Sequence, residues 1–118
     1  MGQTYIDSFF SNPQNPLHKI MVSGLVDTGA TLPIIPESLA RELGVKLAGR
    51  KPVITAKGDT VMDYAILNIE INGEAMAFKT LVSKTLKKVV IGLVVMETFG
   101  YKVNPVEHTL EKIAIEQY

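Results

Sequence analysis

An acidic residue, a hydroxyl and a glycine interrupt an otherwise apolar stretch in the first third of the chain. The stretch covers residues 24–36 and reads GLVDTGATLPIIP, so that Asp27 follows an apolar, strand-like segment directly. A carboxylate between two buried segments loses its hydration and is stable there only with a partner. Asp27 therefore either caps a turn or belongs to a site whose chemistry needs a shielded carboxyl group.

Length and charge restrict both the architecture and the partners. The chain has 118 residues, of which 47% are hydrophobic and 20% are charged, and its formal net charge is zero. A chain of this size forms one domain, residues 1–118, with a single core. Neither nucleic acid nor a membrane is expected as a partner, because both favour a basic surface that a neutral chain lacks.

The chain contains no cysteine, which excludes disulfides and thiolate metal sites. His18 and His108 have no ligand-spaced acidic or cysteine neighbours, so neither a metal nor a cofactor is predicted. Asp7 and the polar run 11–15 come too early for a signal peptide. The longest apolar run, 89–96, is too short to cross a membrane. We therefore expect a cytoplasmic protein.

Clusters of β-branched and aromatic residues between turn signals predict many short strands. The expected strands are residues 4–10, 17–26, 34–35, 52–56, 60–65, 66–71, 75–82, 89–91, 101–103 and 109–115. Two short helices are expected, at 36–44 and 93–99, because each has a glycine at or just past its end. Many strands with only two short helices indicate an all-β domain, either closed or sandwich-like and antiparallel.

Loops between these strands carry clear signals. Lys57-Gly58-Asp59 and Asn72-Gly73 predict hairpin turns. The prolines of residues 12–16 predict a loop, since proline donates no ladder hydrogen bond. The basic segment Lys84-Thr85-Leu86-Lys87-Lys88 is expected to be a solvated surface loop.

Three features in order resemble the retropepsin-like aspartic proteases. Val26-Asp27-Thr28-Gly29-Ala30, followed by Leu32-Pro33-Ile34-Ile35, resembles the active-site signature of that family. Val90-Ile91-Gly92 and the helix after it resemble the hydrophobic-hydrophobic-glycine segment beneath the catalytic loop. Between them, residues 52–65 are hairpin-like where the family has its flap. The resemblance covers residues 17–103. The segment from Asn104-Pro105 onward resembles the small cellular and prokaryotic members of the family more than the viral ones.

The resemblance implies an all-β, closed antiparallel barrel of the acid-protease type, with two short helices and one lobe per chain. Peptide hydrolysis without metal needs one carboxylate to take a proton from water and one carboxylic acid to protonate the carbonyl oxygen. The chain holds a single Asp-Thr-Gly, so an Asp-Asp dyad can arise only if two chains each contribute Asp27. The expected function is therefore an aspartic endopeptidase, a homodimer acting on a peptide or protein substrate.

Residues around Asp27 receive expected roles. The resemblance implies that the Thr28 hydroxyl binds the backbone of the other subunit. Gly29 would let the substrate approach, Ala30 would complete the loop, and Gly92 would support it from below. The expected flap residues are Ala56, Lys57, Gly58, Asp59 and Thr60. The expected cleft walls, which favour apolar side chains, are Leu25, Ile34, Ala56, Val90 and Ile91.

Two features depart from the retroviral pattern. Thr31 and Leu93 stand where the retroviral enzymes carry an acidic residue and an arginine that form an ion pair near the dimer interface. The flap tip carries Lys57 and Asp59, where retroviral flaps are glycine-rich and apolar. The alternative function is a non-proteolytic dimeric module that binds peptides or proteins on the same fold. A third interpretation is a structural β domain in which Asp27 only caps a turn.

Overall fold

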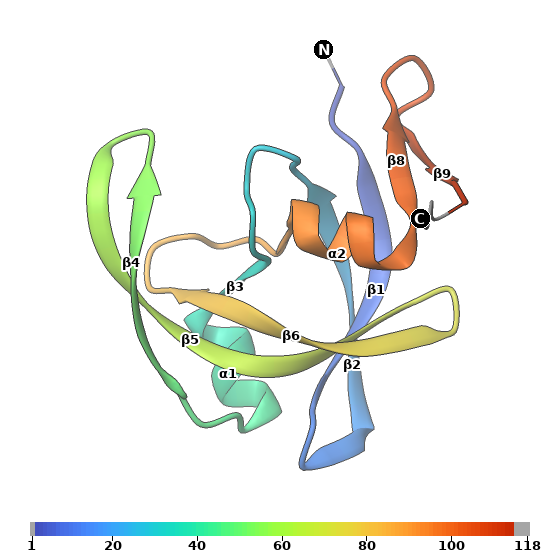
Figure 1. Cartoon of the computed structure of the whole chain (residues 1–118). Coiled ribbons are helices and arrows are strands. Elements are labelled where there is room, and N and C mark those ends of the chain that lie inside the picture. The colour runs from blue at the N-terminus through green and yellow to red at the C-terminus, as the bar shows by residue number, and fades with distance from the viewer. Residues whose placement is uncertain (1, 115–118) are drawn as a thin grey trace, which may run out of the picture.

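The computed structural model describes residues 2–114, and these form nine strands and two short helices (Figure 1). The elements are β1 (Tyr5–Asn12), β2 (Asn15–Val26), β3 (Ile34–Pro36), α1 (Glu37–Leu43), β4 (Gly49–Thr55), β5 (Gly58–Ile71), β6 (Glu74–Ser83), β7 (Val90–Ile91), α2 (Leu93–Phe99), β8 (Tyr101–Asn104) and β9 (Thr109–Lys112). Seven strands form one sheet in the order β1-β2-β7-β3-β6-β5-β4, and β8 pairs with β9. A mostly β domain with two short helices is thereby confirmed.

Strand directions are mixed, which corrects the expectation of a purely antiparallel sheet. β2 runs parallel to β7, and β3 runs parallel to β6. These neighbours are far apart in sequence, so turn geometry, which makes consecutive strands antiparallel, does not set their direction. β1 pairs with β5 as well as with β2. The closed barrel and the single lobe per chain stay predictions.

The core lies on one face of the sheet and is completed by the helices. Every second residue of β5 from Ala65 to Ile71 is buried, as the alternation of side chains along a strand requires. Phe78 of β6 meets Phe99 of α2 edge to face, with ring centroids 5.6 Å apart. Burying each leucine or isoleucine contributes about 1.5–3 kcal/mol. This burial fixes the register of β5, because a slip of one residue would expose the whole apolar set.

β5 is one strand of 14 residues, where the sequence predicted two strands, 60–65 and 66–71. Its first half pairs with β4 and its second half pairs with β6 and β1, so one extended strand takes part in three ladders. The hairpin turn lies at Ala56-Lys57, since Thr55 pairs with Gly58. The expected turn, Lys57-Gly58-Asp59, begins one residue further along the chain. Gly58 has a φ of 115°, a conformation that side chains disfavour.

The loop predicted for residues 12–16 is shorter than expected, because β2 already begins at Asn15. Pro16 lies in β2 where its ladder with β1 is interrupted: the register shifts between Ser11 and Asn12, and residues 16–18 have no partner in β1. Proline is tolerated in such irregular stretches. The expected strand 109–115 is observed only as the shorter β9, which ends at Lys112; residues 113–114 are not in a strand, and residue 115 lies outside the described part of the chain.

Both helices begin and end close to the predicted positions. Glycines follow them in the left-handed conformation, Gly44 with a φ of 68° and Gly100 with a φ of 75°. α1 buries Leu39, Ala40 and Leu43 against the sheet. Within residues 2–114, no helix has the length and apolar character needed to span a membrane.

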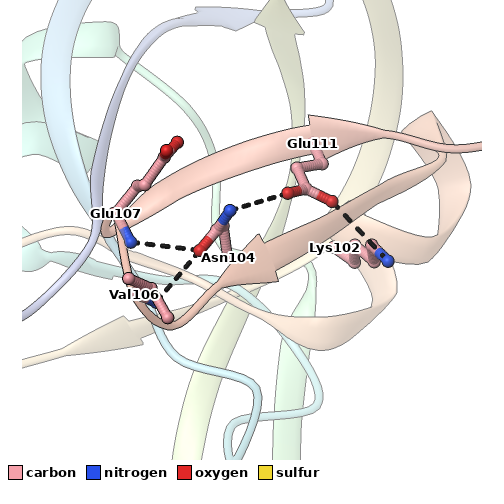
Figure 2. Close-up of polar contacts among 5 residues, drawn as sticks. All are labelled: Lys102, Asn104, Val106, Glu107 and Glu111. Carbon is pink, nitrogen blue, oxygen red and sulfur yellow. Dashed lines mark hydrogen bonds and ion pairs between the residues drawn. The ribbon is translucent and has the colours of Figure 1, made fainter.

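Side-chain hydrogen bonds close the C-terminal hairpin of β8 and β9 (Figure 2). The Asn104 side chain accepts hydrogen bonds from the backbone N–H groups of Val106 and Glu107, both at 3.0 Å. It donates another to Glu111 Oε1 at 2.7 Å, and Lys102 lies 3.6 Å from the second oxygen of Glu111. The side-chain amide of Asn104 therefore stabilises the turn and also links the end of β8 to β9.

Candidate active site

Asp27 is the first residue after β2, and backbone hydrogen bonds hold β2 on both sides at this point. Val26 N–H donates to the carbonyl of Thr4 at 2.8 Å, and Asp27 N–H donates to the carbonyl of Ile91 at 3.1 Å. Thr4 and Ile91 are both buried. The position of the carboxylate is therefore set by buried strands rather than by a free loop.

The loop after β2 folds back on Asp27. Gly29 N–H donates to Asp27 Oδ1 at 2.9 Å, and Ala30 N–H donates to the Asp27 carbonyl at 3.1 Å. A Cβ atom added at Gly29 would lie 3.1 Å from the same carboxylate oxygen, so the close approach suits glycine. The bond to Oδ1 is also what an aspartate that only caps a turn would make.

The start of α2 supports this loop from beneath. Leu93 N–H donates to the Ala30 carbonyl at 2.7 Å, and Val94 N–H donates to the Thr31 carbonyl at 3.0 Å. A Cβ atom on Gly92 would lie 2.6 Å from the backbone of Leu32, a distance that side chains do not adopt. The close contact of two backbones explains the glycine at the position to which we gave the support role.

The loop is open to solvent in the single chain. Asp27, Thr28 and Gly29 are exposed, and Ala30 is half-buried. Asp27 takes part in no ion pair among residues 2–114. The same residues contain no group of three or more histidine, cysteine or acidic side chains able to hold a metal ion.

An apolar row crosses four strands beside the loop. Its members are directly paired across β2, β7, β3 and β6, and none belongs to the main core cluster. They are Leu25, Val90, Ile34 and Leu81. Paired residues of neighbouring strands point to the same face, and Asp27 follows Leu25 by two residues, so the alternation places it on that side.

The row contains three of the five expected cleft residues. Leu25 and Val90 are buried and Ile34 is half-buried, so the row is an apolar layer rather than an open groove. Ile91 points the other way and is fully buried in the core, where a substrate does not reach it. The sequence missed Leu81, because only the pairing of β3 with β6 reveals its place.

The expected flap residues lie at the tip of the hairpin of β4 and β5, which extends away from the helices (Figure 1). Ala56, Lys57, Gly58 and Asp59 are all exposed. At the base of the hairpin, Lys79 lies over the ring of Tyr64, 5.1 Å from its centroid. Hydrogen bonding and charge repulsion from the neighbouring Lys51 lower the pKa of Lys79 below its usual value.

A cavity of about 570 Å³ lies between the hairpin and the end of β6. Of the expected flap residues, Ala56, Lys57 and Thr60 line it, whereas Gly58 and Asp59 do not. Asp27 does not line this cavity either. The structure therefore does not bring the expected flap residues and the Asp27 loop into one pocket of the single chain.

The sequence model of one protein family, described as aspartyl protease, matches residues 18–97. The matched segment includes Asp27, the hairpin of β4 and β5, and Gly92. It covers more than half of the chain. No curated protein matches the chain.

Several solved structures are similar to the chain. A retropepsin-like aspartic protease from Rickettsia conorii is 25% identical, and the match covers 87% of this chain and 77% of that one with a TM-score of 0.64. The EIAV protease, complexed with the inhibitor HBY-793, is 13% identical over 87% of this chain and 93% of its own, with a TM-score of 0.71. The retroviral protease-like domain of Ddi1 from Leishmania major is 17% identical over 98% and 91%, with a TM-score of 0.61. The last two likenesses concern the fold alone.

Proposed function

The chain belongs to the retropepsin-like aspartyl proteases, and from this premise we propose that it is an aspartic endopeptidase in which two chains form one active site. Each chain contributes Asp27 to a dyad on the two-fold axis. Thr28, Gly29 and Ala30 shape the loop around it. The hairpin tip at Ala56–Thr60 serves as the flap over an extended peptide or protein substrate.

The proposal rests chiefly on the way in which the chain holds Asp27. The hydrogen bonds of Val26 and Asp27 fix the end of β2 to buried backbone, while the carboxylate itself stays exposed. A carboxyl group that is held in place by the backbone yet exposed at the surface is accessible to the Asp27 carboxyl group of a second chain. The chain contains one such aspartate, so symmetry must supply the other.

In the proposed reaction, the two carboxyl groups share one proton, because adjacent like charges do not both ionise easily. The ionised group accepts a proton from a water molecule, whose oxygen attacks the peptide carbonyl carbon. The protonated group donates its proton to the carbonyl oxygen, which gives a tetrahedral intermediate. The C–N bond then breaks as the first carboxyl group gives the proton taken from water to the leaving nitrogen, and the second takes a proton back from the hydroxyl group, which restores the dyad.

The missing retroviral ion pair does not argue against this site. Leu93 and Thr31 occupy the two positions concerned, and the same two segments are joined through the backbone. Leu93 N–H binds the Ala30 carbonyl, and Val94 N–H binds the Thr31 carbonyl. Backbone bonds thus join, within one chain, the two segments that carry the ion-pair positions in the retroviral enzymes.

Digestion of a peptide library tests the proposal. Wild-type protein and the Asp27→Asn variant are compared at acidic and neutral pH, with products identified by mass spectrometry. We expect products from the wild type only. Equal amounts of product from both proteins would refute the proposal that Asp27 catalyses peptide hydrolysis.

The alternative is a dimeric module that binds peptides or proteins without cleaving them. The charged side chains of Lys57 and Asp59 at the exposed hairpin tip favour it, because they are poorly suited to close over an apolar substrate. Peptide binding without any product, in both wild type and variant, would support this alternative. The cytoplasmic location stays a prediction.

A further inference from the structure

One edge of β5 is unpaired along the outer half of the hairpin. The ladder between β5 and β6 ends at Asp63 and Val82, whereas the ladder between β4 and β5 continues to Thr55 and Gly58. In an antiparallel sheet, alternate residues direct their N–H and C=O groups to opposite neighbours. Residues 58–62 therefore present backbone donors and acceptors on the side of β6, where no described strand meets them.

The cavity of about 570 Å³ lies along this edge. One wall is formed by residues 60–63 of β5 with the turn at 55–57, and the other by residues 82–85, where β6 ends. In Figure 1 these walls belong to the green hairpin and to the segment that follows the tip of β6. A groove beside an unpaired strand edge suits an extended peptide that adds itself as a strand. Its volume falls within the range of ligand sites.

The charged residues that line this groove are mostly basic. They are Arg50, Lys57 and Lys84, with Asp63 as the one acidic residue. Arg50 lies 3.4 Å from Asp63, so this pair largely neutralises itself. Lys57 and Lys84 are exposed and form no ion pair with any residue from 2 to 114. A positive potential thus remains in the groove, which favours a negatively charged occupant.

The other lining side chains are apolar or carry hydroxyl groups. They are Ala56, Val61, Met62, Val82, Thr55, Thr60, Ser83 and Thr85. The Ser83 hydroxyl is already used, because it accepts hydrogen bonds from the N–H groups of Thr85 and Leu86. A groove lined by apolar side chains and by two lysines suits a side chain with a methylene stem and a carboxylate end.

We propose that this β5-edge groove binds an extended segment of the substrate that carries a glutamate or aspartate. The segment pairs with the free edge of residues 58–62 and directs its carboxylate toward Lys57 and Lys84. Asp27 does not line the groove, so the bound segment lies apart from the bond that is cleaved. The inference rests on the proposed function only in taking the bound chain to be a substrate.

Binding to the Asp27→Asn protein tests this inference without any cleavage. The probes are fluorescent peptides of extended sequence that carry one glutamate, the same peptides with glutamine, and the glutamate peptides with N-methylated backbone. Fluorescence anisotropy at low salt gives each Kd. The protein variants are Lys84→Glu, Lys57→Glu and the control Lys46→Glu, which reverses a lysine that lies outside the groove.

We expect the glutamate peptides to bind about fivefold tighter than the glutamine peptides. The preference should disappear in Lys84→Glu and Lys57→Glu, persist in Lys46→Glu, and weaken as salt rises. N-methylation should weaken binding by removing strand hydrogen bonds.

Equal affinity for glutamate and glutamine peptides, or a preference that survives both groove substitutions, would overturn the inference. If the wild type still cleaves the peptide library in that case, the proposed endopeptidase function stands although the groove inference fails. No binding of any peptide, together with no cleavage, would overturn both.

Discussion

The Asp27 loop and the hairpin of β4 and β5 are held in opposite ways. Residues 27–31 are tied by backbone hydrogen bonds to buried strands and to the start of α2. Beyond Asp63, toward the tip of the hairpin, β4 and β5 pair only with each other among the described residues. Ile54 in this outer part is 86% exposed. The group proposed to do the chemistry is thus fixed by the core, whereas the element proposed to admit the substrate is held by few contacts. Each prediction below tests one side of this contrast.

Loss of the Asp27 carboxylate should have the largest effect, and only on catalysis. In Asp27→Asn we expect kcat/KM to fall by about 10³-fold or more, because an amide neither accepts the proton of water nor donates one to the carbonyl oxygen. Thermal unfolding should change little, since the exposed side chain makes one hydrogen bond, to Gly29. A large fall in Tm would assign Asp27 a structural role instead.

Truncating a core isoleucine should separate the two regions in stability. Ile69 in the inner half of β5 is fully buried, whereas Ile54 in the hairpin is largely exposed. We expect Ile69→Ala to lower the free energy of unfolding by about 2–5 kcal/mol, and Ile54→Ala to change it by less than about 0.5 kcal/mol. Urea titration measures both. Similar losses would mean that the hairpin is packed as firmly as the core.

Two glycine substitutions should differ for the same reason. Gly92→Ala places a Cβ 2.6 Å from the Leu32 backbone, so the Asp27 loop must move. We expect a loss of about 2–3 kcal/mol together with lower activity. Gly58→Ala meets no atom within 4 Å and strains only its own φ, which should cost about 1 kcal/mol. Equal losses of stability and activity in the two variants would contradict the contrast.

The smallest effect concerns a lysine pair at the base of the hairpin. Lys51 lowers the pKa of Lys79, so the protonated form of Lys79 is disfavoured in the folded state. This destabilisation is present below the folded-state pKa and disappears as pH rises through the unfolded value. Lys51→Met should therefore raise the urea midpoint slightly near pH 8 and have no effect near pH 11. An equal shift at both pH values would point to packing rather than charge.

The sequence predicts well what local chemistry decides. The turn at Asn72-Gly73 is confirmed, with φ values of 51° and 84° that asparagine and glycine tolerate best. Gly44 and Gly100 end their helices as expected. In each case the residue itself restricts the backbone, so no knowledge of distant neighbours is needed.

Non-local pairings escape such an analysis. The parallel pairing of β3 with β6 decides that Leu81 joins the apolar row beside Asp27, and the pattern of β6 does not reveal it. The unbroken course of β5 depends on three different partners along its length. Lys84 is exposed, as the expected surface loop requires, but its place beside the cavity depends on where β6 leaves β5 and is not visible in the sequence.

Mixing of wild-type and Asp27→Asn chains tests the central claim, that two copies of Asp27 form one site. A fixed amount of wild-type protein is incubated with an equal amount of the variant until the chains exchange, and peptide hydrolysis is then measured. Random pairing leaves about half of the wild-type chains in wild-type dimers, so activity should fall to about half and decline further with excess variant. Activity that stays constant at every ratio, although exchange between the chains is demonstrated, would contradict the account.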